Sequence, residues 1–427
     1  MRSQSKSPPR IALGLITVFL LVFLSLQFIR PEVGNPPVTA DLQAPPQVKE
    51  ILRNSCYNCH SNETNLAWFD QIAPAYWLVA RDVRQARMHL NFSELAAQPA
   101  AKQKAGLFEA VNQVQLGAMP LPSYLRVHPG AAVTHDQLAI LRRYLLPPPQ
   151  TATDPAPANA QYVKWISSRP KVTEPPTEPP VALNGVRFQV GYENWKLVNS
   201  TDRFDNQTMR VILGNEIAMK AIAGNQINPW PDGTAFAKVT WYQEPDGKGF
   251  VRTGAFEQVE FMIRDSKKYG ATKNWGFARF RGVDLKPYGA SPAFADECVG
   301  CHNPVRNSDY VYTIPVAALA GDLPFNPLHW NVITTFVNRT DSTMSTLFGN
   351  DAAVHYARTH SQHEYPAGSA LALVTWAQRE DPRWFGGNIP ATVKSVEFAK
   401  PGPAPSEREA DLLSQRGAVM PEPGYSW

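Results

Sequence analysis

Two pentapeptides of the form Cys-x-x-Cys-His constrain this chain more than any other feature of its sequence. Together they contain all four of its cysteines. In this pattern two thiols attach covalently to one haem, and the adjacent histidine becomes an axial ligand of the iron. A structural zinc site, a redox-active dithiol and a disulfide are the alternatives, but none explains a histidine directly after both second cysteines. The sequence therefore predicts two covalently bound c-type haems. The predicted attachment positions are Cys56, Cys59, Cys298 and Cys301, and the predicted axial ligands are His60 and His302.

The charge balance argues against a nucleic-acid partner. The 427 residues include 41 lysines and arginines and 37 aspartates and glutamates, for a net charge of +4, and the basic residues do not cluster. The length exceeds that of a typical single domain, so two or three domains are expected. The 39 prolines gather in a few stretches that are typical of spacers.

The N-terminus predicts an exported protein. Arg2, Lys6 and Arg10 precede an uncharged apolar run over 11–29, which just meets the length of about 20 residues that a transmembrane helix needs. We expect an uncleaved membrane anchor. A cleaved signal peptide is the alternative, but its small-residue site at 38–40 lies rather far from the apolar run. Either interpretation places the rest of the chain on the periplasmic side of a bacterial inner membrane.

The first haem motif lies between two predicted helices. Val48, Ile51 and Leu52 have helical spacing and lead directly into the motif. At the other end, Thr134 and Asp136 are candidate N-caps of a helix that stops before a run of prolines. Two terminal helices over one haem resemble the small class I cytochromes c. The segment is also similar to a haem-binding domain family known from periplasmic cytochromes.

Met119 is the candidate sixth ligand of the first haem. It stands before a proline, downstream of the first motif, and so resembles the ligand loop of class I cytochromes c. A thioether ligand raises the reduction potential. His89, His128 and His135 are alternatives that give a bis-histidine site of lower potential, and a core methionine is the remaining interpretation. With both axial positions filled, this haem has no vacancy for substrate and is expected to carry electrons.

The second haem motif belongs to a module with strand-like alternation. Apolar and polar residues alternate over 235–242, 258–263 and 275–280, which predicts an antiparallel sheet. Several short segments follow one another in an informative order. They are Asp232–Thr234 with Lys238, Asp265–Tyr269, Asn274–Trp275 with Phe277 and Phe280, Glu297–His302, and Asp309–Thr313. In this order they resemble the cytochrome P-460 family, which includes the cytochromes c-prime-beta, over about 184–316.

The resemblance implies an open coordination position. In that family His302 is the proximal ligand, and the opposite face of the iron is free for a small molecule. The enzymes of the family join a lysine to the porphyrin edge, and Lys238 stands at the matching position. The cytochromes c-prime-beta lack this bond and bind nitric oxide in an apolar pocket. A lysine that extends from a sheet edge into solvent is the structural alternative.

An internal duplication follows the second module. Identical residues recur at a constant separation of 135 positions. The pairs are Trp195 and Trp330, Met209 and Met344, Asn215 and Asn350, Pro231 and Pro366, and Trp241 and Trp376. The second copy lacks a haem motif, ends after the Val396–Phe398 counterpart of Val259–Phe261, and has Leu373 at the position of Lys238. We expect this haem-less copy to pack against the haem-bearing one in place of a subunit partner.

These patterns predict an α+β multidomain chain. The predicted segments are a signal anchor or transmembrane helix at 1–30, a proline-rich stalk at 31–46, a small all-α cytochrome c-like domain at 47–146, a proline-rich linker at 147–183, an antiparallel-β-rich P-460-like haem domain at 184–325, its haem-less partial repeat at 326–398, and a C-terminal tail at 399–427.

The resemblance and the two haems together suggest hydroxylamine oxidation. Hydroxylamine would be oxidised at the second haem towards nitric or nitrous oxide, and electrons would pass to the first haem and then to a soluble cytochrome. Lys238 and Glu297 are the candidate catalytic residues, with Glu260 and Asp265 as further candidate bases. A nitric oxide binding, scavenging or sensing protein and a pure electron carrier are the alternatives. A dihaem peroxidase is disfavoured because the second module resembles a different family.

Overall fold

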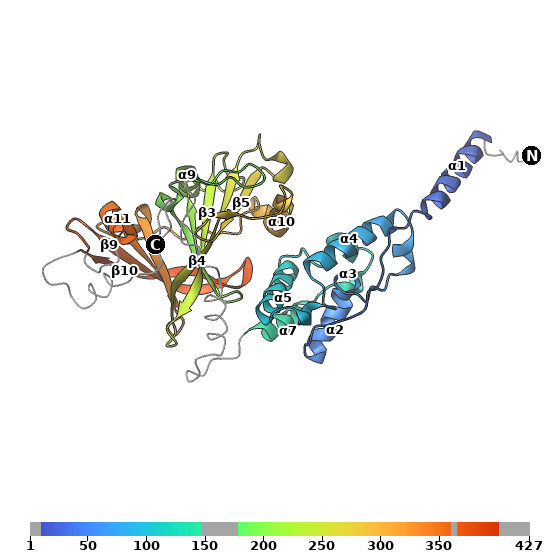
Figure 1. The fold of residues 1–427 in the computed structure, drawn as a ribbon, viewed down its shortest axis with the longest axis horizontal. Helices are drawn as coiled ribbons and strands as arrows, with labels where there is room; N and C mark the ends of the chain where they lie inside the picture. The colour runs from blue at the N-terminus through green and yellow to red at the C-terminus, as the bar shows by residue number, and fades with distance from the viewer. Residues whose placement is uncertain (1–9, 147–177, 360–364, 401–427) are drawn as a thin grey trace, which may run out of the picture. The chain divides into compact units, whose positions relative to one another are not determined.

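The computed structural model describes residues 10–146, 178–359 and 365–400 (Figure 1). The chain divides into two compact units, Met1–Leu145 and Leu146–Trp427. Most of the predicted linker at 147–183 and nearly all of the predicted tail at 399–427 lie outside the described residues.

The first unit is helical. Its helices are α1 (Arg10–Leu26), α2 (Pro46–Ser55), α3 (Tyr57–His60), α4 (Ala75–His89), α5 (Ala100–Gln115), α6 (Pro122–Leu125) and α7 (His135–Leu145). Both predicted terminal helices are confirmed as α2 and α7. Val48, Ile51 and Leu52 are buried on one side of α2, which contacts α7. Thr134 precedes α7, and its hydroxyl accepts a hydrogen bond from the Gln137 N–H at 3.2 Å, as an N-cap does.

The apolar N-terminal segment forms α1, which has 17 residues. Within the described ranges, no helix combines the length and the apolar character that crossing a membrane requires. The prediction of an N-terminal transmembrane helix is therefore not supported.

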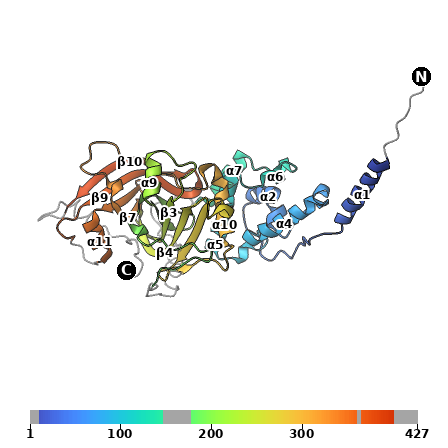
Figure 2. The ribbon, with the colours of Figure 1, turned by 90° about the horizontal axis from the view of Figure 1, so that it is seen from above.

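The second unit is built on one ten-stranded antiparallel sheet (Figures 1 and 2). Its strands are β1 (Lys196–Arg203), β2 (Thr208–Gly214), β3 (Ala235–Pro245), β4 (Phe250–Arg264), β5 (Trp275–Arg281), β6 (Lys286–Pro287), β7 (Asn331–Asn338), β8 (Thr343–Gly349), β9 (Leu371–Asp381) and β10 (Trp384–Ala399). Its helices include α9 (Glu216–Ala223), α10 (Phe294–His302) and α11 (Asp351–Thr359). The strand order is β3-β2-β1-β10-β9-β8-β7-β4, and pairing of β3 with β4 closes it into a barrel. The predicted antiparallel sheet is confirmed.

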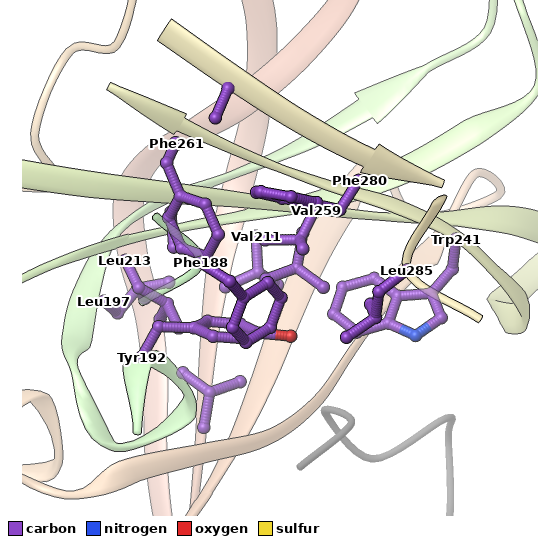
Figure 3. Packing of buried hydrophobic residues seen from close by; sticks show 14 of the residues in the cluster. Phe188, Tyr192, Leu197, Val211, Leu213, Trp241, Val259, Phe261, Phe280 and Leu285 are labelled. Atoms are coloured by element: carbon purple, nitrogen blue, oxygen red, sulfur yellow. The ribbon is translucent and has the colours of Figure 1, made fainter. Parts of the chain in front are cut away.

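Alternation along the strands separates two apolar faces. Ala237, Val239 and Trp241 of β3 point into the main core, where they meet side chains from the other strands. Figure 3 shows the aromatic part of this core, in which Phe188, Tyr192, Phe261 and Phe280 lie against one another. Phe236 and Lys238 of β3 point to the opposite face. A second, smaller cluster forms on that face against α9 and α10.

The duplication is visible in the order of the elements. The series β1-β2-α9-β3-β4 is repeated as β7-β8-α11-β9-β10. Asn215 and Asn350 cap the two helices with the same bonds. Each side-chain oxygen accepts from the N–H three residues later, at 3.0 Å for Asn215 and 3.1 Å for Asn350. Each also accepts from an N–H where the next strand begins, from Ala235 at 3.1 Å and from Ala370, directly before β9, at 3.0 Å. The predicted internal repeat is thus confirmed by its structure.

The two copies complete one another. Strand β1 of the haem-bearing copy pairs with β10 of the haem-less copy, and β4 pairs with β7. Because these pairings join the two halves of the barrel, neither copy has a closed sheet by itself. The expectation that the haem-less copy packs against the haem-bearing one is confirmed.

Candidate haem sites

The first motif is carried by the end of α2 and the short helix α3. The Cys56 N–H donates to Leu52 O at 2.8 Å, which continues the helical bonding into the motif. His60 Nδ1 lies 3.0 Å from Leu90 O. A carbonyl can only accept, so Nδ1 carries the proton and the Nε2 lone pair is left for a metal. Burial lowers the pKa of His60, which favours this neutral form.

The candidate sixth ligands of the first haem have different surroundings. His89 and His135 are exposed. His128 Nε2 lies 3.0 Å from Asp70 Oδ1, so this histidine is already engaged. Met119 is half-buried in the turn after α5, and its N–H donates to Gln113 O at 3.1 Å. Among the four candidates, the surroundings therefore favour Met119.

The second motif lies on α10. His302 Nδ1 is 2.6 Å from Tyr310 O, so this histidine also donates from Nδ1 and keeps Nε2 for a metal. Its ring lies between Phe277 and Tyr312, with both ring centroids 5.2 Å away. Burial lowers the pKa of His302 to about 4, so the imidazole is neutral at physiological pH. Both histidines thus have the bonding of axial ligands.

The four cysteines of the two motifs lie within the described residues, and none of them is in a disulfide. Burial raises the pKa of Cys56 to about 12 and the pKa of both Cys59 and Cys298 to about 11. Such thiols are protonated at neutral pH, unlike those of redox-active dithiols. Across the described ranges, no three His, Cys, Asp or Glu side chains form a group that could hold a metal ion. The donor set therefore fits haem attachment better than a zinc cluster.

An apolar wall faces the second motif. Phe236, Met262 and Phe277 lie side by side on β3, β4 and β5. They belong to the smaller cluster, which Cys298 of the motif also contacts. An apolar surface beside a half-buried histidine is suited to the face of a porphyrin.

A row of charged side chains borders this wall. Lys238, Glu260 and Arg279 lie directly opposite one another on β3, β4 and β5. Lys238 forms an ion pair with Glu260, and Arg279 Nε donates to the other oxygen of Glu260 at 2.6 Å. Burial alone would raise the pKa of Glu260, but Arg279 and Lys238 together hold it well below its usual range. Burial lowers the pKa of Lys238, although 33% of its side chain stays exposed. Lys238, Glu260 and Arg279 are each two positions along their strand from Phe236, Met262 and Phe277, so the row lies directly beside the apolar wall.

Comparison with known families gives the same two modules. Residues 21–146 match a haem-binding domain, and residues 189–313 match cytochrome P460. The chain thus carries a match to a haem-binding domain followed by a match to cytochrome P460, and the second region is called the P460 domain below. No curated protein sequence matches it.

The other two candidate bases, Glu297 and Asp265, have partners other than Lys238. Glu297 is exposed on α10, and its carboxylate accepts from the Tyr288 hydroxyl at 2.9 Å. Asp265 accepts from the N–H groups of Lys267 and Lys268 at 3.0 and 2.9 Å, which stabilises a turn. The ion pair of Lys238 is with Glu260. Of the predicted bases, Glu260 is therefore the one that the fold brings to the lysine.

The haem-less copy shows what is particular to the P460 domain. In the register of β9 and β10, Leu373 faces Glu397 as Lys238 faces Glu260 in β3 and β4. The glutamate is present in both copies, whereas the lysine is replaced by a buried leucine. Lys238 therefore coincides with the presence of a haem motif. Sequence reasoning missed Arg279, although its place in the alternation of β5 puts it on the face of Glu260.

Proposed function

We propose that this chain is a dihaem c-type cytochrome whose P460 domain oxidises hydroxylamine. Electrons then pass through the haem of the N-terminal domain to a soluble acceptor cytochrome. The observation that carries the proposal is the Lys238–Glu260 ion pair beside the apolar wall of the second motif, which the haem-less copy lacks. The basic N-terminus before α1 supports an exported location.

Haem, when bound through the second motif, supplies an iron that can take electrons from a small nitrogen compound. His302 would hold this iron through Nε2, because its Nδ1–H is committed to Tyr310 O. The apolar wall would offer few hydrogen bonds to water beside the iron. In the oxidation of hydroxylamine to nitric oxide, each electron removed is accompanied by a proton. A proton acceptor at the site is therefore required.

Glu260 is the proposed acceptor. Its low pKa keeps the carboxylate ionised throughout the physiological range. The same low pKa makes it a weak base, so we expect it to orient the N–H and O–H groups of the substrate as well as to receive protons. Arg279 holds one oxygen of the carboxylate, and Lys238 pairs with the other oxygen while its amine is free.

Lys238 is proposed to be joined to the porphyrin edge, as the resemblance to cytochrome P460 enzymes implies. Replacing a porphyrin C–H bond by a C–N bond to Nζ releases two electrons and two protons. We assign the electrons to an external peroxide, which is reduced to water. The burial of Lys238 lowers its pKa and so favours the neutral amine that such a bond requires.

The test is hydroxylamine-dependent reduction of an acceptor cytochrome by the full chain. We expect turnover by the wild type and a loss of about 100-fold or more in Glu260→Gln, because a positioned proton acceptor contributes about 10²–10⁴ in rate. Glu216→Gln is the matched control, since Glu216 is exposed and pairs with Lys220 on α9. A wild type that does not turn over would contradict the proposal.

Nitric oxide binding without turnover is the second candidate function. The apolar wall of Phe236, Met262 and Phe277 favours it, because small uncharged gases partition into apolar pockets. Binding of nitric oxide or carbon monoxide to the ferrous protein, with no oxidation of hydroxylamine, would support this candidate. Absence of both activities would leave electron transfer as the function.

A further inference from the structure

Residues 309–312, here called the proximal loop, bring the carbonyl group of Tyr310 to His302. Asp309 and Tyr310 have φ values of 50° and 65°. This left-handed conformation is unfavourable for residues other than glycine. The loop can therefore keep this shape only if contacts outside it compensate.

The haem-bearing copy holds the first residue of the proximal loop. The Asp309 carboxylate accepts from the Trp230 N–H and from the Arg264 guanidinium, both at 2.9 Å. The indole Nε1–H of Trp275 donates to Asp309 O at 2.9 Å. These three bonds position the start of the loop but not its end.

The haem-less copy holds the end of the proximal loop. Arg383 Nη1 donates to Val311 O at 2.9 Å and to Tyr312 O at 3.1 Å. The Trp384 ring packs edge-on against Tyr312, with centroids 5.6 Å apart. Tyr312 in turn packs against His302 and donates its hydroxyl to Cys301 O at 2.7 Å. Two residues of the haem-less copy thus lie one contact away from the axial ligand.

Trp384 is itself fixed from the haem-bearing copy. Its Nε1–H donates to Asp205 Oδ2 at 3.0 Å. The Arg203 guanidinium lies 4.2 Å from the centre of its ring, in a cation–π contact. Arg203 and Asp205 form a buried ion pair with each other. The indole therefore has a defined orientation towards Tyr312.

The turn that carries Arg383 and Trp384 has a counterpart in the haem-bearing copy, in which other residues stand at these two positions. Both turns begin with an aspartate whose Oδ1 accepts from the N–H two residues later, at 2.8 Å for Asp381 and 2.7 Å for Asp246. Where the haem-less copy has Arg383 and Trp384, the haem-bearing copy has Lys248 and Gly249. The turn is shared, whereas the two side chains that reach the proximal loop belong to the haem-less copy alone.

We propose that Arg383 and Trp384 are positioning residues of the second haem site, and that holding the proximal loop is a function of the haem-less copy. The inference rests on the proposed binding of haem through His302. A carbonyl held firmly on Nδ1–H increases electron donation by the imidazole and stabilises the ferric state. If the loop is released, this bond weakens and the reduction potential of the second haem rises.

The experiment measures the reduction potentials and ferrous absorption spectra of both haems in the full chain. We expect Arg383→Ala and Trp384→Ala to raise the potential of the second haem, and the first haem to stay unchanged as an internal reference. Trp384→Phe, which keeps a ring against Tyr312, restores the wild-type potential. Lys248→Ala is the matched control at the equivalent turn position, where the side chain is exposed, and it shifts neither potential.

Two results would overturn the inference. In the first, Arg383→Ala and Trp384→Ala lower the melting temperature while both potentials and spectra keep their wild-type values. If these two variants do not fold, Arg383→Met and Trp384→Phe decide. The methionine keeps an unbranched side chain but donates no hydrogen bond to Val311 O or Tyr312 O, so it raises the potential, whereas the phenylalanine does not. In the second, the second motif of the wild type carries no haem, which contradicts the proposed function as well and is recognised before any variant is made.

Discussion

Lys238 and Glu260 face each other across β3 and β4 and form an ion pair beside the apolar wall of the second haem site. In the haem-less copy the lysine position holds Leu373, which faces Glu397. The two copies therefore show the same strand position with a lysine and with a leucine. The leucine of the haem-less copy suggests the substitution that tests what Lys238 contributes to the site.

The first prediction concerns how much Glu260 contributes to the free energy of unfolding as the pH changes. The pKa of Glu260 is lower in the folded chain than its ordinary value of 4.5. The ionised carboxylate therefore makes its full contribution to stability when the pH is above 4.5. This contribution decreases as the pH falls below 4.5 towards the lower pKa of the folded chain. We expect Glu260→Gln to reduce the free energy of unfolding by about 1–3 kcal/mol at pH 7 and by progressively less below about pH 4.5. Urea unfolding at several pH values measures this difference.

The control for this prediction is the exposed Glu216–Lys220 pair on α9. Glu216→Gln is expected to change stability by less than about 0.5 kcal/mol at every pH, because exposed ion pairs contribute little. A pH-independent difference between the wild type and Glu260→Gln would show that the carboxylate charge is not what stabilises the site.

The second prediction uses the substitution that the repeat already contains. Lys238→Leu should fold, because a leucine occupies the equivalent buried position in β9. It should lose hydroxylamine oxidation while it still binds carbon monoxide, since the apolar wall is unchanged. Steady-state turnover and a carbon monoxide difference spectrum measure the two properties. Full turnover by this variant would remove Lys238 from the mechanism.

The third prediction identifies the sixth ligand of the first haem. Met119→Ala should open this iron to carbon monoxide and lower its reduction potential, because a thioether ligand is lost. His128→Gln should do neither, because His128 bonds to Asp70. Redox titration of the separate bands of the two haems distinguishes the variants. The opposite pattern would assign the ligand to His128.

The fourth prediction tests the duplication energetically. Asn215 and Asn350 cap equivalent helices with equivalent bonds. Asn215→Ala and Asn350→Ala should each cost about 1 kcal/mol of stability, because each removes an N-cap. The double variant should lose about the sum, as distant sites usually do. Very unequal losses, measured by denaturant unfolding, would mean that one copy does not share in the cooperative fold.

Local patterns in the sequence predicted much of this fold. Helix α2 follows from the spacing of Val48, Ile51 and Leu52, and β3 follows from its alternation, which also places Lys238 away from the main core. Each haem motif consists of five consecutive residues, so both could be identified from the sequence alone. The repeat was visible because its identical residues keep one separation along the chain.

Contacts between distant segments could not be predicted in this way. Closure of the barrel depends on pairing of β1 with β10, whose partners Arg203 and Gly387 are far apart in the sequence. The contact of Arg383 with the proximal loop likewise has no local signal. The expected transmembrane helix was not supported, because α1 is shorter than the apolar run that suggested it.

The ferrous absorption spectrum of the full chain, recorded beside that of Lys238→Ala, tests the central claim most directly. A lysine bonded to the porphyrin changes its conjugated ring, whereas an ion pair near the ring does not. We predict a strongly red-shifted band in the wild type that is absent from Lys238→Ala, together with ordinary c-haem bands from the first haem in both proteins. Identical spectra with only ordinary c-haem bands would contradict the account.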